Sequence, residues 1–124
     1  MPRPSILVVD DELLIRDLLY DFFTEREWDI TIAENGERAL ERLRAREYDV
    51  LLTDLKMPNI DGATLIESAR AEFPQMPVVV MTGYPSVESA VDCLRKRVAD
   101  YLIKPFNISK LYKVVQETHS SRKQ

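Results

Sequence analysis

The chain has 124 residues, 45% of them hydrophobic and 31% charged, which is typical of one globular domain with a single core. Its formal net charge of -4 argues against the clustered basic surface that phosphate backbones require, so we expect no direct contact with nucleic acid. The single cysteine, Cys93, excludes an internal disulfide and favours a reducing cytoplasm. The apolar run before Asp10 is too short for a signal peptide or a membrane span, so we expect neither.

Five short β-rich runs are spaced along the chain, and most of them are apolar on both faces. They cover residues 5–9, 29–33, 50–53, 78–81 and 101–103. Runs of this kind are typical of a parallel sheet that is covered by helices on both sides. Only the second run alternates apolar with polar residues, which predicts an edge strand.

A helical pattern follows each run. The apolar stripes are Ile15, Leu18, Leu19 and Phe22; Ala39, Leu40 and Leu43; Leu65, Ile66 and Ala69; Val87, Ala90, Val91 and Leu94; and Leu111, Val114, Val115 and Thr118. The predicted N-caps are Asn35, Asp61, Ser86 and Asn107. Strand then helix, five times over, predicts a doubly wound (βα)5 α/β fold. By analogy with flavodoxin-like folds, we expect its five-stranded parallel sheet to have the order 2-1-3-4-5. We expect one domain over residues 1–119, and residues 120–124 to be a polar tail or the start of a linker.

Polar residues follow four of the five predicted strands. Asp10 and Asp11 follow the first, Asp54 the third, Thr82 the fourth and Lys104 the fifth. In open α/β sheets the ligand site lies beyond the carboxyl ends of the strands, where the strand order reverses. The sequence therefore predicts that three acids, a hydroxyl and a cation converge at one end of the sheet.

Three carboxylates at close range repel one another unless a cation joins them. Lys104 is one candidate, and Mg²⁺ is another because it prefers oxygen ligands, usually with several waters and a phosphate oxygen. The hydroxyl and the ammonium complete a set that can clamp a transferring phosphoryl group. One of the carboxylates is then a candidate nucleophile, since aspartates form aspartyl-phosphates in other proteins.

Five motifs in this order resemble the receiver domain of two-component response regulators. They are Ile6-Leu7-Val8-Val9-Asp10-Asp11-Glu12; Leu52-Thr53-Asp54-Leu55-Lys56-Met57-Pro58; Asp61-Gly62; Met81-Thr82-Gly83-Tyr84; and Asp100-Tyr101-Leu102-Ile103-Lys104-Pro105-Phe106. The resemblance covers nearly the whole chain. It implies that Asp54 accepts a phosphoryl group from a histidine of a sensor kinase or phosphotransfer protein in the cytoplasm.

The resemblance also assigns roles around Asp54. Asp11 and Asp54 would bind Mg²⁺ directly, with Mn²⁺ as a possible substitute, Asp10 would act through water, and the backbone carbonyl of Lys56 would complete the metal site. Thr82 and Lys104 would hold phosphoryl oxygens. By the same resemblance the chain is not an enzyme, apart from its own phosphorylation and dephosphorylation at Asp54.

The family further implies a readout in which Thr82 moves toward the phosphate and Tyr101 turns inward. These movements would change the face made by the fourth helix, fifth strand and fifth helix, which a downstream effector domain or a second copy of the chain would bind. The Lys104-Pro105 bond is expected to be cis, and the side chains of Lys56 and Tyr84 occupy positions that tune the lifetime of the phosphate.

The chain departs from the family where Arg97-Val98 stands in place of the common Gly-Ala. Glycine there would relieve a helix end that requires positive φ, so arginine predicts either a different helix end or strain. We also expect His119 to be exposed on the last helix, Cys93 to lie in the fourth helix without a chemical role, and Trp28 to lie at the end of the sheet opposite the site.

The sequence is also compatible with two other functions. A Mg²⁺-dependent phosphohydrolase with an aspartyl nucleophile is one, although such enzymes of the haloacid-dehalogenase type carry Asp-x-Asp after the first strand, and here the sequence is Asp10-Asp11-Glu12. A receiver fold that serves only as a constitutive interaction module is the other.

Overall fold

Five strands and five helices alternate along the chain in the computed structural model, which describes residues 2–57 and 61–123. The strands are β1 (Ser5–Val9), β2 (Asp29–Ala33), β3 (Val50–Asp54), β4 (Val78–Thr82) and β5 (Asp100–Ile103). The helices are α1 (Leu13–Glu25), α2 (Gly36–Ala45), α3 (Gly62–Glu72), α4 (Val87–Arg95) and α5 (Ile108–Lys123). All five predicted strands and helices are confirmed, whereas Pro58 in the predicted phosphoacceptor loop lies outside the described residues.

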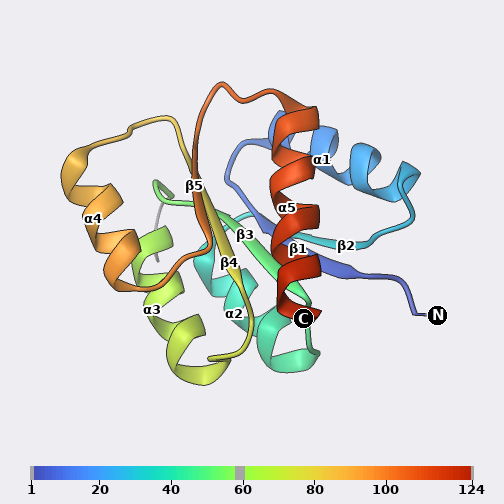
Figure 1. Cartoon of the computed structure of the whole chain (residues 1–124), viewed down its shortest axis with the longest axis horizontal. Coiled ribbons are helices and arrows are strands. Elements are labelled where there is room, and N and C mark those ends of the chain that lie inside the picture. Colours follow the sequence, from blue (N-terminus) through green and yellow to red (C-terminus); the bar gives the residue numbers. More distant parts are fainter. Residues whose placement is uncertain (1, 58–60, 124) are drawn as a thin grey trace.

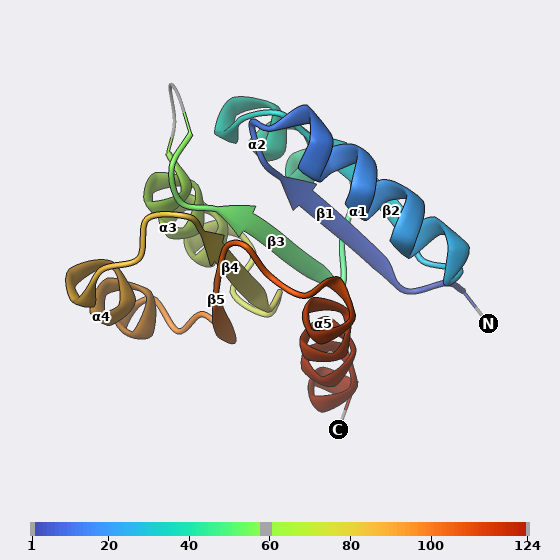
Figure 2. The same ribbon diagram turned by 90° about the horizontal axis from the view of Figure 1, so that it is seen from above.

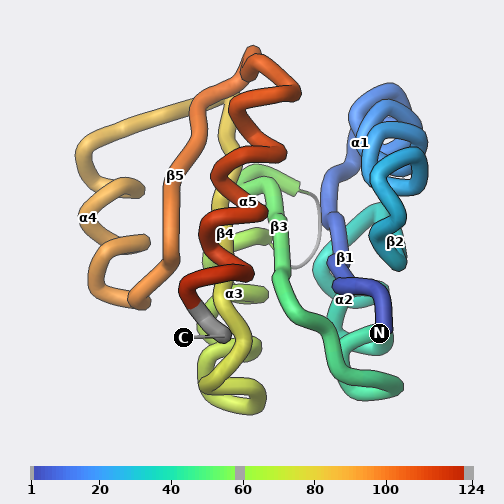
Figure 3. The backbone as a smooth tube through the Cα atoms, turned by 45° about the vertical axis from the view of Figure 1, so that its right-hand side comes forward, coloured from blue at the N-terminus to red at the C-terminus, as the bar shows by residue number. Residues whose placement is uncertain are grey.

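The sheet is parallel throughout and its strand order is β2-β1-β3-β4-β5, as predicted (Figure 1). β1 and β3 are hydrogen-bonded neighbours, with Val9 opposite Thr53, so the residues that follow these two strands emerge side by side. The tube in Figure 3 shows the strands running in the same direction, with α4 beyond β5 at one edge of the sheet. In the part of the chain that the structure describes, no helix is long and apolar enough to span a bilayer.

Two apolar layers hold the helices against the sheet. One layer joins alternate residues of the strands to α2 and α3 and reaches Cys93 of α4; the other joins the remaining strand residues to α1 and α5. Figure 2 shows these two groups of helices on opposite faces. Every residue of β1, β3 and β4 is buried, because both faces of these central strands are covered.

Residue burial corrects two of the predicted apolar stripes. In α1 the fully buried residues are Leu19 and Phe23, whereas Leu18 is 48% exposed. Cys93 lies in α4, as predicted, and is the buried residue of this helix, whereas three residues of the predicted apolar stripe are exposed. They are Val87, Val91 and Leu94. The spacing predicted both helices correctly, but it does not say whether an apolar stripe faces the core or the solvent.

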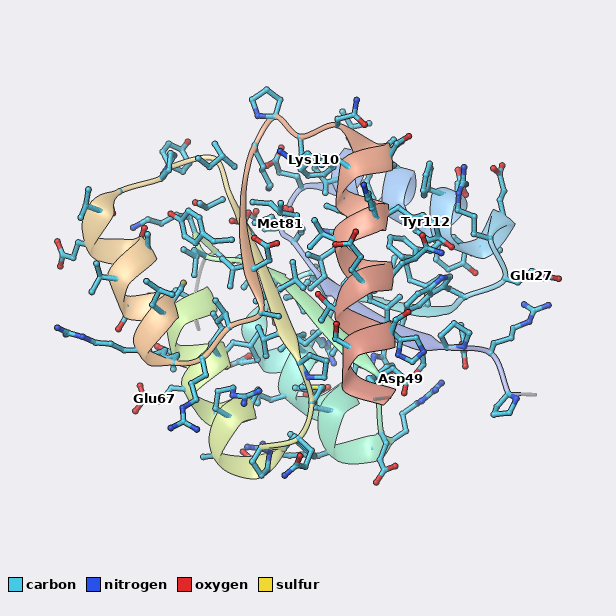
Figure 4. The ribbon with its side chains drawn as sticks, viewed as in Figure 1. Glu27, Asp49, Glu67, Met81, Lys110 and Tyr112 are labelled. Carbon is cyan, nitrogen blue, oxygen red and sulfur yellow. The ribbon has the colours of Figure 1, made fainter. Side chains whose placement is uncertain are left out.

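An aromatic cluster fastens α5 to α1 and to the start of β2, at the end of the sheet opposite the carboxyl ends of the strands. Tyr112 of α5 lies 5.5 Å from Phe22 and 5.4 Å from Phe23 between ring centroids, and Figure 4 shows it directed toward α1. Trp28 donates a hydrogen bond to the Tyr112 hydroxyl and contacts His119 edge to face. His119 is therefore only 8% exposed, and the prediction of an exposed side chain was wrong because α5 turns this residue onto Trp28.

The four predicted N-caps are confirmed by hydrogen bonds from the first turn of each helix. Asn35, Asp61 and Ser86 accept from the amides of Arg38, Thr64 and Ser89, and Asn107 accepts from Ser109 and Lys110. The Lys104–Pro105 bond is cis, as the family resemblance implied. Residues 120–123, predicted as a polar tail, continue α5.

Just after α4 the chain adopts the left-handed conformation at a residue that is not glycine. Arg97 has a φ of 59°, and the amide of Val98 donates to the carbonyl of Cys93 at 3.2 Å, as in the helix ends that usually contain glycine at this position. Of the two alternatives that the sequence left open, the structure shows the strained one. A non-glycine residue in this conformation costs roughly 1–2 kcal/mol.

Gly62 lets α3 begin directly against the backbone of Asp54. Its amide donates to the Leu55 carbonyl at 2.9 Å, and a Cβ at this position would lie 2.1 Å from the Asp54 carbonyl oxygen. The neighbouring atoms are backbone and cannot move aside without shifting β3. Glycine is required here because of this close approach.

Replacing Arg97 with glycine is expected to stabilise the protein by about 0.5–1 kcal/mol, because relief of the left-handed conformation exceeds the entropy cost of glycine. Arg95→Gly, in the last turn of the same helix, is the matched control and is expected to destabilise it by about 0.5–1 kcal/mol. Urea unfolding measures both changes. A loss of stability in Arg97→Gly would contradict the interpretation of this helix end.

Replacing Gly62 with alanine is expected to lower the free energy of unfolding by about 1–3 kcal/mol or more, since the new Cβ overlaps backbone atoms. Gly83→Ala is the control, because its nearest neighbour would be a Lys104 side-chain atom at 3.9 Å and its cost should stay within about 0.5 kcal/mol. Thermal and urea unfolding compare the two variants. Equal stability of both would show that α3 can shift away from Asp54.

Candidate functional site

A single ammonium group lies among three carboxylates at the carboxyl ends of the strands. Nζ of Lys104 is 2.6 Å from Oδ2 of Asp10, 2.9 Å from Oδ2 of Asp54 and 3.1 Å from Oε1 of Glu12. The Asp10 side chain is fully buried and the Asp54 side chain is 6% exposed, whereas the Glu12 side chain is 60% exposed. Two buried charges therefore depend on Lys104, and the third contact is formed at the surface.

Three different strands deliver these groups to one place. β1 leads directly into Asp10, β3 ends on Asp54, and β5 leads directly into Lys104. Backbone contacts fix the chain there, because Asp10 donates its amide to the Ala33 carbonyl and accepts a bond from Arg16 at its own carbonyl. The sequence prediction that these residues converge is confirmed by the ion pairs between them.

Both oxygens of Asp54 are engaged. Oδ1 accepts a hydrogen bond from the amide of Lys56 at 3.2 Å, and Oδ2 accepts one from Lys104. The amide bond fixes the orientation of the carboxylate from the loop that follows β3, while the ammonium holds the other oxygen from β5. The carboxylate is thus positioned by two segments that lie far apart in the sequence.

Burial and charge act in opposite directions on the ionisable groups of the site. Burial is the main cause that holds the pKa of Asp10 above its ordinary value, and the charge of Asp54 adds to it, although Lys104 and the Glu12 amide oppose the shift. Burial lowers the pKa of Lys104, but the hydrogen bonds to Asp10 and Asp54 outweigh it and the pKa lies above its ordinary value. Lys104 therefore stays protonated, while the carboxylates still repel one another.

The acidic groups fit a hard divalent cation. Ligand oxygens of Asp10, Asp11, Glu12 and Asp54 all lie within 4.8 Å of one another, and Asp11 and Glu12 are exposed to solvent. Carboxylate oxygens at this spacing beside open solvent suit Mg²⁺, which keeps several of its waters. The predicted ligation by the carbonyl of Lys56 stays a prediction; its amide contacts Asp54.

Thr82 and Tyr101 lie on β4 and β5, and the Thr82 carbonyl accepts the amide of Lys104 at 2.8 Å. Thr82 is the last residue of β4, is fully buried, and accepts a hydrogen bond from the Tyr84 amide at 3.0 Å. Tyr101 is half-buried in β5, packs against the apolar layer of α2 and α3, and its hydroxyl lies 2.7 Å from Oγ of Ser89. The described side-chain contacts bring together Asp10, Asp54 and Lys104. Thr82 and Tyr101 are not among these contacts and lie on the neighbouring strands β4 and β5.

Two residues of the site region were missed by the sequence interpretation. Glu12 was noted only as part of a motif, yet it provides the third contact of Lys104. Its position directly after Asp10-Asp11 was the available signal. Ser89, which contacts Tyr101, lies three residues after the N-cap Ser86 and carried no signal by itself, because a serine in a first helical turn is common.

Comparison with known proteins agrees with this site. The sequence model of the response regulator receiver domain matches residues 6–116. The transcriptional regulatory protein ZraR of Escherichia coli K12 is 36% identical over 120 residues, which cover 94% of this chain and 27% of ZraR. The chain spans about a quarter of the length of the curated relatives it matches.

Solved structures show the same fold. A CheY-like receiver domain protein from Methanospirillum hungatei is 27% identical, with a TM-score of 0.95 and coverage of 98% of this chain and 97% of that one. The response regulator TrrA of Thermotoga maritima, solved in complex with Mg²⁺ and BeF, is 32% identical, with a TM-score of 0.84 and coverage of 93% and 98%. The chain therefore belongs to the family of response regulator receiver domains, the signalling switches of two-component systems.

Proposed function

We propose that Asp54 accepts a phosphoryl group from the phosphohistidine of a sensor kinase or phosphotransfer protein. The observation that carries this proposal is the position of the Asp54 carboxylate, buried at a strand end and held by the Lys56 amide and by Lys104. A new bond would form between an Asp54 oxygen and phosphorus as the bond between phosphorus and the histidine nitrogen breaks. The imidazole is the leaving group, and the charge of the phosphoryl oxygens must be balanced during transfer.

The chain's own residues provide part of that balance. Lys104 is protonated and presents three donors, which now contact carboxylates and would turn to phosphoryl oxygens. The Thr82 hydroxyl, on the adjacent strand, is the second donor that we assign to these oxygens. When bound, Mg²⁺ supplies further positive charge, and Mn²⁺ is a substitute of similar ligand preference.

We assign the metal ligands from the acidic group and from the family. Asp10, Asp11 and Asp54 belong to the acidic group described above. As the family resemblance implies, Asp11 and Asp54 are the proposed direct ligands, with the Lys56 carbonyl, and Asp10 acts through water. The exposed side chains of Lys56 and Tyr84, two residues after Asp54 and Thr82, are the proposed determinants of phosphate lifetime. Loss of the phosphate is, in this proposal, the chain's own hydrolytic step.

The surface that would report phosphorylation is formed by α4, β5 and α5. Large apolar side chains are exposed on α4 and β5, which is unusual for a surface that contacts only water. They are Val87, Val91, Leu94 and Ile103. We infer that an effector domain, or a second copy of the chain on phosphorylation, binds there. Because the curated relatives are about four times longer, an effector domain in the same protein is one natural occupant.

Two further assignments belong to this proposal. The protein is assigned to the cytoplasm, where sensor kinases present their phosphohistidine. No direct contact with DNA by this chain is proposed, given its formal net charge of -4.

Incubation with acetyl phosphate and Mg²⁺ is expected to add one base-labile phosphoryl group, which intact-mass spectrometry detects. Asp54→Asn should abolish the addition, whereas Asp17→Asn, an exposed carboxylate on α1, should leave it unchanged. An unchanged mass of the wild-type chain, or an equal addition to Asp54→Asn, would contradict the proposal.

Mg²⁺ is expected to stabilise the folded chain, because it relieves the repulsion among the carboxylates. At a concentration 100 times its dissociation constant the gain is about 2.7 kcal/mol. Asp11→Asn should remove most of this gain while Asp17→Asn keeps it, as measured by urea unfolding with Mg²⁺ and with EDTA. The same Mg²⁺ response in both variants would place the ion elsewhere.

A further inference from the structure

The Tyr101 hydroxyl contacts Ser89 in the first turn of α4, next to the N-cap of this helix. Ser86 is the N-cap residue, and its Oγ accepts the amide of Ser89 at 3.0 Å. Oγ of Ser89 lies 3.0 Å from Oγ of Ser86, 3.1 Å from the Ser86 carbonyl and 2.7 Å from the Tyr101 hydroxyl. We call Ser86, Ser89 and Tyr101 the α4 cap network.

The number of protons fixes the direction of these bonds. The Ser86 carbonyl can only accept, so the single proton of the Ser89 hydroxyl is donated to it. Ser89 Oγ then accepts from the Ser86 hydroxyl and from the Tyr101 hydroxyl, which uses both of its lone pairs. Tyr101 is the donor, and every hydroxyl of the network is satisfied.

The α4 cap network connects β5, through Tyr101, to the loop that leads from β4 to α4. Thr82 ends β4, and the loop that follows it reaches Ser86 after three residues. The Thr82 hydroxyl holds the Tyr84 amide within that loop. A change at Thr82 therefore acts on the segment that ends in the α4 cap, and Tyr101 of β5 is bonded to the same cap.

We propose that Ser89 is a positioning residue that holds Tyr101 in its resting place, so that phosphorylation must break the Ser89–Tyr101 bond before Tyr101 can move. This inference rests on the proposed function, because it specifies how the switch at Thr82 and Tyr101 is restrained. Loss of the Ser89 hydroxyl removes its bond to Tyr101, which in this proposal belongs to the resting state, together with its two contacts to Ser86 within the α4 cap. It shifts the equilibrium toward the state that binds a phosphoryl group.

The affinity for beryllofluoride in the presence of Mg²⁺, measured by calorimetry, tests the proposal. Ser89→Ala is expected to bind about two- to tenfold more tightly than wild type, in line with the loss of the one hydrogen bond that restrains Tyr101. Ser89→Thr, which keeps the hydroxyl, should restore wild-type affinity. Ser109→Ala, on the exposed first turn of α5, is the control for loss of a serine hydroxyl and should change nothing. An unchanged or weaker affinity of Ser89→Ala, or no rescue by threonine, would overturn the proposal.

A double-mutant cycle without Mg²⁺ separates this inference from the function on which it rests. Ser89→Ala and Tyr101→Phe each remove one partner, so their effects on urea unfolding should not add in the double variant. Additive effects would overturn the resting bond and leave the phosphorylation of Asp54 untouched. If wild-type protein bound no beryllofluoride, the proposed function would fail, whatever the outcome of the cycle.

Discussion

The arrangement of the site depends on one ammonium group that faces too many carboxylates. Lys104 contacts Asp10, Asp54 and Glu12, and two of these three side chains are almost completely buried. Removing charges from water is costly unless they are paired, and one cation cannot balance three anions. The site is therefore held together and at the same time remains short of positive charge, which accounts for its fit to a divalent cation.

The fold keeps this unfavourable cluster in place because its strands are rigid. β1 and β3 are buried on both faces between two apolar layers, so Asp10 and Asp54 cannot separate to relieve their repulsion. Gly62 adds a further restraint by allowing α3 to begin against the Asp54 backbone. Packing energy is thus used to hold charges where they would not gather by themselves. The opposite end of the sheet is closed by the cluster around Trp28 and Tyr112, far from this chemistry.

Much of the fold and of the site could be predicted from the sequence, because polar residues at the ends of buried parallel strands mark the ligand site of an α/β sheet. The alternation of strands and helices and the N-caps follow from local pattern. The strand order came from the analogy with flavodoxin-like folds, and with it the convergence of Asp10, Asp54 and Lys104 follows from topology. The outward stripe of α4 and the burial of His119 could not be predicted, since periodicity gives a helix face without its partner. The positive φ of Arg97 was one of two alternatives that the sequence left open. Ser89 could not be identified from the sequence, because its role depends on its contact with Tyr101 of β5.

The central claim is that the carboxylate cluster becomes a phosphoryl site only when a divalent cation joins Asp54 and its neighbours. Calorimetric titration with beryllofluoride, carried out with Mg²⁺ and again with EDTA, tests it most directly. The account predicts one site per chain with Mg²⁺, no measurable binding with EDTA, and no binding by Asp54→Asn under either condition. Equal binding with and without the metal, or full binding by Asp54→Asn, would contradict it.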